Sequence, residues 1–91
     1  MTIHERIDAE CENIKQLLIS KNKAYGNSFA EPLNIFSSVD AEEAINVRID
    51  DKLKRIMCGQ EKEHVPEDTE LDLIGYLILK RVYRNSQGET I

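Results

Sequence analysis

Three stretches of this 91-residue chain repeat apolar residues at steps of three and four, the spacing that places side chains on one face of an α-helix. They cover about residues 2–20, 40–59 and 66–84. No window alternates apolar and polar residues long enough to indicate a strand. The three apolar stripes comprise Ile3, Ile7, Cys11, Ile14, Leu17 and Leu18; Ile45, Ile49, Leu53 and Ile56; and Leu71, Ile74, Leu77, Ile78 and Val82. The pattern predicts an all-α fold, a small bundle of three main helices with these stripes facing inward.

Capping residues indicate where the helices begin and end. Thr2 is a suitable N-cap with Glu5 as its capping-box partner, and Asp40 is placed to cap the second helix. Gly59 is expected to stop that helix. Pro66 suits the first turn of the third helix, because proline has no N–H to leave unpaired there.

The first connection, about residues 22–40, is long and contains several turn formers. Connections of that length inside small domains usually carry function. The tail 85–91 is expected to fray. Since no repeat or linker divides the chain, we interpret residues 1–91 as a single helical domain.

Composition restricts the possible partners. With 41% apolar residues, two Phe, three Tyr and no Trp, the core is thin, because a chain of this size buries only about 60% of its unfolded surface. We therefore expect a homo-oligomer to supply further burial. The net charge of -5 argues against binding along a nucleic-acid backbone, although local basic clusters can bind a small phosphate ligand.

The chain also lacks the patterns of membrane, secreted and zinc proteins. No run approaches the ~20 apolar residues of a membrane span, and the first residues have no apolar signal-peptide core, so we expect a cytoplasmic protein. Cys11 and Cys58 lack metal-ligand spacing and lie on the apolar sides of their helices. They are predicted to be buried free thiols, and His4 and His64 to be surface groups.

A basic, glycine-containing turn follows the first helix at residues 21–29. Gly26 can take positive φ, and the N–H groups of Gly26, Asn27 and Ser28 are a candidate anion-binding nest. Lys21 and Lys23 add positive charge, and Tyr25 is placed to stack on a base. The alternative is a helix C-terminus with lysines against its dipole and with Tyr25 and Phe29 folded onto the core.

The second helix carries a mostly cationic face. Arg48, Asp51, Lys52 and Arg55 recur at steps of three and four. One interpretation is a solvated face with internal ion pairs, which is the usual role of such runs. The excess of cations in an otherwise acidic chain favours the other, a phosphate-binding face, because guanidinium groups match phosphate oxygens bidentately.

Carboxylates gather at the start of the third helix. Glu67, Asp68 and Asp72 can converge on one point, and carboxylate oxygens are ligands for Mg²⁺ shared with substrate phosphates. Glu67 and Asp68 are equally explained as compensation of the helix dipole. Asp72 lies a turn deeper, where a charge requires water or a partner such as Arg48 or Lys52, so a structural salt bridge and a metal or phosphate role both remain open.

Three segments, residues 21–29, 48–56 and 67–76, together resemble a known family in their order and intervals. They are similar to the nucleotide-modification-associated domain of many phage and prophage proteins, itself related to the all-α NTP pyrophosphatases of the MazG type. The resemblance spans about residues 15–80.

This resemblance implies a helical, usually oligomeric protein whose helix faces bind a nucleotide, with Mg²⁺ in the pyrophosphatases. It assigns the acidic motif to Glu67, Asp68 and Asp72, and the RxxDK motif to Arg48, Asp51 and Lys52. Two departures concern catalysis. Ala24 replaces the acid of the family's Asp-Tyr-Gly loop, and Asp51, flanked by cations, stands where an ExxE pair is expected.

The resemblance leaves two functional interpretations of different classes. In the first, a Mg²⁺-dependent nucleoside triphosphate pyrophosphohydrolase, the catalytic and metal-binding carboxylates are Asp51, Asp68, Asp72 and Glu67. The nucleotide is then held by Lys21, Lys23, Tyr25, Gly26, Asn27, Ser28, Arg48, Lys52 and Arg55. The alternative is a non-catalytic protein that binds or sequesters host nucleotides or a nucleotide signal. A helical assembly protein without a ligand is the third possibility.

Overall fold

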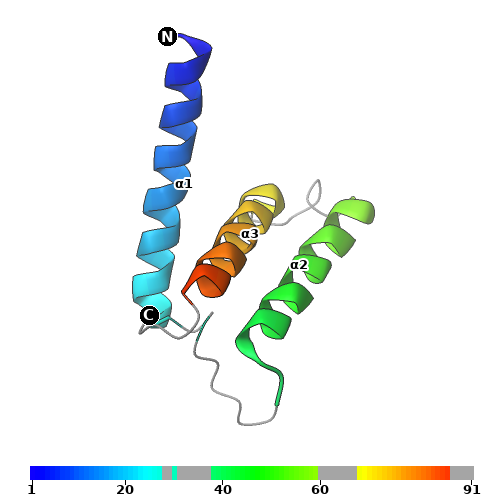
Figure 1. Ribbon diagram of the computed structural model, residues 1–91. Coiled ribbons are helices and arrows are strands. Elements are labelled where there is room, and N and C mark those ends of the chain that lie inside the picture. The colour runs from blue at the N-terminus through cyan, green and yellow to red at the C-terminus, as the bar shows by residue number, and fades with distance from the viewer. Residues whose placement is uncertain (28–29, 31–37, 60–67, 87–91) are drawn as a thin grey trace.

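The computed structural model describes residues 1–27, 30, 38–59 and 68–86. It contains three α-helices, α1 (Ile3–Tyr25), α2 (Ala41–Met57) and α3 (Thr69–Asn85) (Figure 1). The residues described include no strand. The prediction of an all-α fold with three main helices is confirmed.

The predicted caps of α1 and α2 are present. The Thr2 hydroxyl accepts a hydrogen bond from the Glu5 N–H at 3.1 Å, and the Glu5 carboxylate accepts one from the Thr2 N–H at 3.2 Å. Asp40 Oδ1 accepts from the Glu43 N–H at 2.8 Å. Each bond satisfies a backbone donor that has no partner within the helix, so the chain enters both helices at defined residues.

The C-terminus of α1 lies five residues beyond the predicted one. The helix continues through Tyr25 and ends at Gly26, which adopts the left-handed conformation with φ 58° and ψ 46°. The Gly26 N–H donates to the Asn22 carbonyl. Residues 21–25 tolerate helical geometry, and glycine supplies the positive φ that ends the helix. The first connection therefore begins later than expected.

The third helix begins later than predicted. Asp68 is the N-cap of α3, and its Oδ1 accepts from the Leu71 N–H at 2.9 Å. Pro66, the predicted start, lies in the stretch 60–67 outside the described residues. The predicted stop of α2 is confirmed, since the helix ends at Met57 and Gly59 follows with φ 67°. Of the tail expected to fray, only residues 85 and 86 are described.

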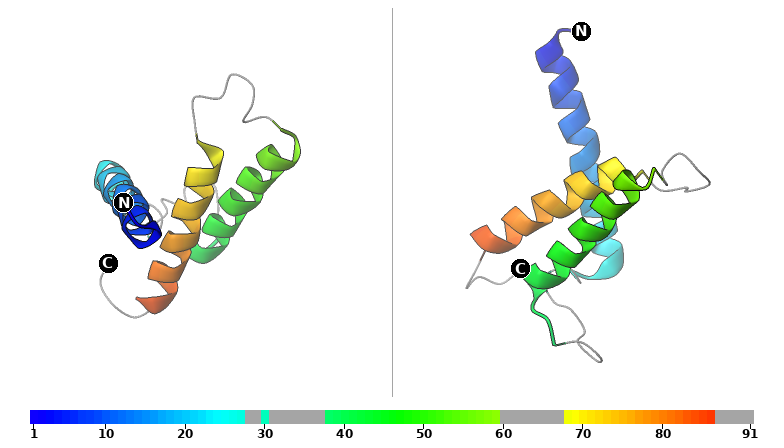
Figure 2. Two further views of the ribbon diagram at one scale, coloured as in Figure 1. Left: turned by 90° about the horizontal axis from the view of Figure 1, so that it is seen from above. Right: turned by 90° about the vertical axis from the view of Figure 1, so that its right-hand side faces the viewer.

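Helices α2 and α3 lie side by side, and α1 meets them through its C-terminal half (Figures 1 and 2). The N-terminal half of α1 extends past the other two helices in these views. Gly75 of α3 lies where α1 approaches closely, because a Cβ built there would be 2.9 Å from Leu18 Cδ2. A small residue at this position lets the two helices meet.

Few of the predicted inward-facing side chains are covered in the single chain. In the part of the chain that the structure describes, the buried hydrophobic residues are Ala41 and Ile45. Eight members of the predicted stripes are exposed, namely Ile3, Ile7, Cys11, Leu53, Ile56, Leu77, Ile78 and Val82. Three helices of which one touches the others through half its length cannot enclose all three stripes.

The prediction that both cysteines are buried is wrong. Cys11 and Cys58 are free and exposed. Cys11 lies on the half of α1 that extends past the other helices, so its apolar face has no neighbour there. Cys58 is the C-cap of α2, beyond the last helical turn. His4 is exposed as expected, and His64 lies outside the described residues.

Candidate functional site

A pocket of about 490 Å³ lies between the three helices. Its volume falls within the range of small-molecule sites, about 300–1,000 Å³. The polar lining consists of Lys21, Asn22 and Tyr25 from α1, Arg48 and Lys52 from α2, and Asp72 and Tyr76 from α3. The apolar lining includes Leu17, Leu18, Ile45, Leu71 and Leu79. All three charged segments singled out in the sequence therefore contribute to one cavity.

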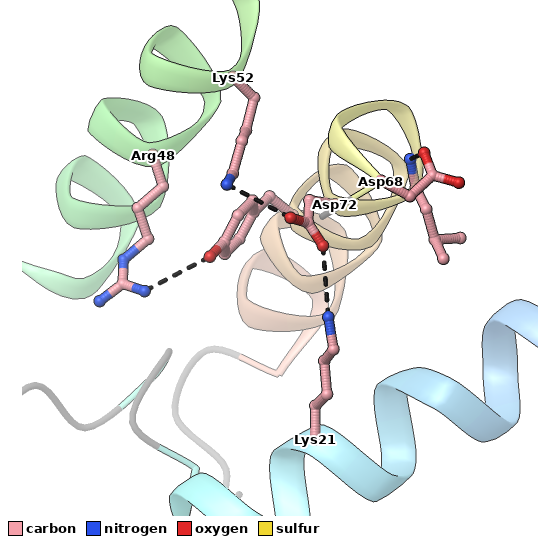
Figure 3. A network of polar contacts seen from close by, with 7 residues as sticks. Lys21, Arg48, Lys52, Asp68 and Asp72 are labelled. Atoms are coloured by element: carbon pink, nitrogen blue, oxygen red, sulfur yellow. Dashed lines mark hydrogen bonds and ion pairs between the residues drawn. The ribbon is translucent and has the colours of Figure 1, made fainter. Parts of the chain in front are cut away.

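Asp72 joins the three helices through its carboxylate. Its Oδ1 is 3.3 Å from Lys21 Nζ of α1, and its Oδ2 is 3.3 Å from Lys52 Nζ of α2 (Figure 3). The side chains of Asp72 and Lys52 are 16% and 11% exposed, whereas that of Lys21 is 50% exposed. Of the two roles left open for Asp72, the salt bridge with α2 is present, and its partner there is Lys52.

Arg48 contacts Tyr76 rather than Asp72. Its Nη1 lies 3.5 Å from the Tyr76 hydroxyl oxygen, and its guanidinium carbon lies 5.9 Å from the centre of the ring. The hydrogen bond is long and therefore weak, while the distance to the ring is within the range of a cation–π contact. Figure 3 shows Arg48 and Lys52 extending from α2 toward α3.

The pocket is positive although the protein is acidic. Three cations and one carboxylate contribute to its described lining, whereas the whole chain has a net charge of -5. Cations grouped in a concave site raise the local concentration of anions. The arrangement suits a small anionic ligand whose remaining surface is partly apolar.

The predicted cationic face of α2 is divided by the helix geometry. Arg48 and Lys52, one turn apart, line the pocket, but Asp51 and Arg55 do not. Asp51 is exposed, because adjacent residues of a helix are separated by about 100° around its axis. Lys23 is also exposed and does not line the pocket.

The amide groups predicted to form an anion nest are occupied. The N–H groups of Gly26 and Asn27 both point to the Asn22 carbonyl, as in an ordinary helix C-terminus. The nest hypothesis is therefore wrong for these two residues, and Ser28 lies outside the described residues. Tyr25 is 71% exposed and lines the pocket, so it is not folded onto the core as the alternative required.

The predicted metal ligands that the structure describes, Asp51, Asp68 and Asp72, do not form a group. Asp68 caps α3 and is turned away from Lys21 and Lys52 (Figure 3), Asp51 lies outside the pocket lining, and Glu67 is outside the described residues. Residues 1–27, 30, 38–59 and 68–86 contain no group of three or more His, Cys, Asp or Glu that could hold a metal. Mg²⁺ binding therefore stays a prediction of the resemblance.

Sequence reasoning missed Tyr76 and Asn22 as lining residues. The signal that could have found Tyr76 is its position one helical turn after Asp72, on the same face of α3. Asn22 lies one residue after Lys21 in the segment first interpreted as a turn, and its place in the pocket follows from the extra turn of α1.

Comparison with protein-family models, curated proteins and solved structures gives no match for this chain. The resemblance described above thus remains a hypothesis about function. Among the described helices, none is long and apolar enough to cross a membrane.

Proposed function

We propose that this protein binds a nucleotide or a similar phosphate ligand in the pocket between its helices and retains it uncleaved. The observation that carries the proposal is the convergence of Lys21, Arg48 and Lys52 on a partly apolar pocket with one described carboxylate, Asp72. Phosphate groups would neutralise the cations, and the apolar lining would take the less polar part of the ligand. Host nucleotides and nucleotide signals in the host cytoplasm are the ligands that fit the resemblance.

The three cations of the pocket would contact a phosphate group in different ways. Arg48 presents a planar fork that can donate two parallel hydrogen bonds to one phosphate, whereas Lys21 and Lys52 act as compact charges. Both lysines contact Asp72, so an incoming phosphate competes with this carboxylate for them. Tyr25, largely exposed beside the pocket, offers a ring for stacking on a base.

A second candidate, a Mg²⁺-dependent nucleotide pyrophosphohydrolase, is favoured by Asp72 alone. Its carboxylate lies in the pocket, and Mg²⁺ can be held by one or two carboxylates together with substrate phosphates. In the described residues, however, both oxygens of Asp72 contact lysine ammonium groups. We therefore place this candidate second and derive no metal-dependent step.

Calorimetry with a panel of NTPs, dNTPs and cyclic dinucleotides, with and without Mg²⁺, tests the proposal. The expected result is saturable binding of at least one ligand, recovered intact by chromatography. Arg48→Ala and Lys52→Ala should each weaken binding by about tenfold or more, from roughly 1.5–3 kcal/mol for a charge-assisted hydrogen bond.

The matched controls are Arg81→Ala and Lys54→Ala, which remove exposed cations outside the pocket lining and should leave affinity unchanged. Release of pyrophosphate would replace the proposal with the second candidate. Binding of no ligand in the panel would reject both and leave the helical assembly protein.

A further inference from the structure

Asn22 is the one amide side chain in the described lining of the pocket. It lies in the last turn of α1 and is partly buried. Its Nδ2 donates a hydrogen bond to Oδ1 of Asn27, the residue that follows the Gly26 cap. In the described part of the chain this is the one hydrogen bond of the Asn22 side chain. Its amide oxygen, which can accept two hydrogen bonds, is therefore available to a ligand.

Asn27 fixes which end of the Asn22 amide is left over. Among the described residues it is the one non-glycine residue with positive φ, at 60°, a conformation that asparagine tolerates better than most residues. This turn brings its side chain back beside Asn22. The Asn27 Oδ1 can only accept, so the nitrogen of Asn22 faces it and the oxygen of Asn22 is left for the pocket. Asn27 does not line the pocket itself.

The charged groups of the described lining cannot serve the same purpose. Lys21, Arg48 and Lys52 donate hydrogen bonds and have no acceptor. Both oxygens of Asp72 contact lysine ammonium groups. Ionised phosphate oxygens accept hydrogen bonds, so they match the cations and not the oxygen of Asn22. That oxygen is suited to a hydroxyl or N–H group in another part of the ligand.

Asn22 lies between the side chains that would contact the phosphate and the base. Lys21 precedes it, Tyr25 follows one helical turn later, and all three line the pocket. Lys21 and Tyr25 are about 6 Å apart along the helix axis. The sugar joins phosphate to base in a nucleotide, so a ligand with its phosphate at Lys21 and its base at Tyr25 places its sugar beside Asn22.

We propose that Asn22 Oδ1 accepts a hydrogen bond from a ribose hydroxyl of the ligand, and that Asn27 is the positioning residue for this contact. The inference rests on the proposed function, because it requires a nucleotide in the pocket. It adds that the pocket selects ribonucleotides over analogues that lack the contacted hydroxyl. A pair of asparagines that only closes the end of α1 would give no such selection.

Calorimetric titration with analogues that lack one hydroxyl tests the selection. ATP, GTP, CTP and UTP are each compared with their 2′-deoxy and 3′-deoxy analogues, and cyclic di-GMP with its 2′-deoxy form. Removal of one of the hydroxyls should weaken binding by about three- to tenfold, the value of one neutral hydrogen bond. Equal affinities within every set that binds would overturn the inference and leave the proposed function standing. Binding of no ligand would reject the proposed function, and this inference with it.

Substitutions of Asn22 test whether this residue makes the selection. Asn22→Leu and Asn22→Ala should both bind ribose and deoxy ligands with an affinity ratio near one, because neither side chain can accept a hydrogen bond. Asn13→Leu is the matched control, since Asn13 is exposed on the same helix outside the pocket lining, and it should keep the wild-type ratio. Circular dichroism verifies that the variants are helical. A wild-type ratio in both Asn22 variants would overturn the inference.

Asn27 is tested by a pair of variants that both suit its backbone. Asn27→Gly tolerates the positive φ and removes the partner of Asn22, so the affinity ratio should fall toward one. Asn27→Asp keeps an oxygen that can accept from Asn22 and should restore most of the wild-type ratio. An unchanged ratio in Asn27→Gly would overturn the role assigned to Asn27.

Discussion

Asp72 is the residue at which the three helices meet electrostatically. It contacts a lysine of α1 and a lysine of α2, although these residues are 51 and 20 positions away in the chain. The need for a partner could be predicted, because a carboxylate between Leu71 and Leu73 lies on a partly apolar helix face. The identity of Lys21 could not, since it depends on how α1 packs.

Asp72→Asn separates the two candidate functions. The change removes a negative charge from the pocket. The asparagine side chain cannot form ion pairs with Lys21 and Lys52. If the protein binds its ligand uncleaved, affinity for a phosphate ligand should rise about three- to tenfold, about 0.7–1.4 kcal/mol, in a calorimetric titration. Unfolding should become easier by about 1–3 kcal/mol, because a partly buried ion pair is broken. Loss of binding or of Mg²⁺-dependent turnover would favour the hydrolase.

The pair between Glu12 and Lys15 gives a prediction about titration. The hydrogen bond and ion pair at 2.8 Å lower the pKa of Glu12 and raise the pKa of Lys15. Because its pKa is lowered in the folded state, the Glu12 carboxylate stabilises helix α1 at pH values above the pKa that Glu12 has in the unfolded chain. This stabilisation is lost as pH falls through the pKa of Glu12 in the folded protein. Glu12→Gln should return the pKa of Lys15 toward its ordinary value in an NMR titration. An unchanged Lys15 titration would contradict the contact.

At the scale of elements, local signals predicted the helices better than their ends. The Thr2 and Asp40 caps depend on neighbouring residues, and both are present. The end of α1 was placed too early because lysine and asparagine in residues 21–23 were interpreted as a turn, although only Gly26 has the required φ. The pocket could be predicted only as a meeting of charged segments. Its lining depends on the angle at which each side chain leaves its helix.

Asp68 tests whether a carboxylate at the start of α3 caps the helix or takes part in a metal site. Asp68→Ala should destabilise the protein by about 1 kcal/mol, whereas Asp68→Asn should retain most of the stability, because asparagine is also a good N-cap. Urea unfolding measures both. Ligand affinity should be unchanged in either variant. A large loss of binding in the stable asparagine variant would instead assign Asp68 to the site.

Gly75 sets the approach of α3 to α1. Gly75→Ala should be nearly neutral, since alanine favours the helix by about 1 kcal/mol and the nearest atom, Leu18 Cδ2, ends a flexible side chain. Gly75→Val should cost about 1–3 kcal/mol, because its extra methyl groups overpack the contact. Urea unfolding of the two variants under one set of conditions checks the difference. A valine variant as stable as the wild type would show that the helices do not meet here.

The whole molecule is extended for its length. Its radius of gyration is 14.9 Å, compared with about 12 Å for a compact domain of 91 residues. The composition predicted a thin core, and the few buried hydrophobic side chains in the described residues agree with that prediction. Periodicity could not show which parts of the stripes are covered by the same chain, because it reports the face of a helix and not its neighbour.

Thermal unfolding should depend on protein concentration. If the predicted homo-oligomer completes the fold, mass action raises the melting temperature as concentration increases, because association stabilises the folded state only. Calorimetric scans over a wide concentration range should show this rise for the wild type. A constant wild-type melting temperature would show that a single chain is stable alone.

Within the described residues, helix α1 contacts the rest of the protein through its C-terminal half only, so a change in its tilt displaces its N-terminus. Its 23 residues form a helix about 34 Å long. Leu18 lies at the contact with α3. Ile3 lies about 22 Å from that point along the axis, so a tilt of a few degrees at the pocket moves the far end by more than an ångström.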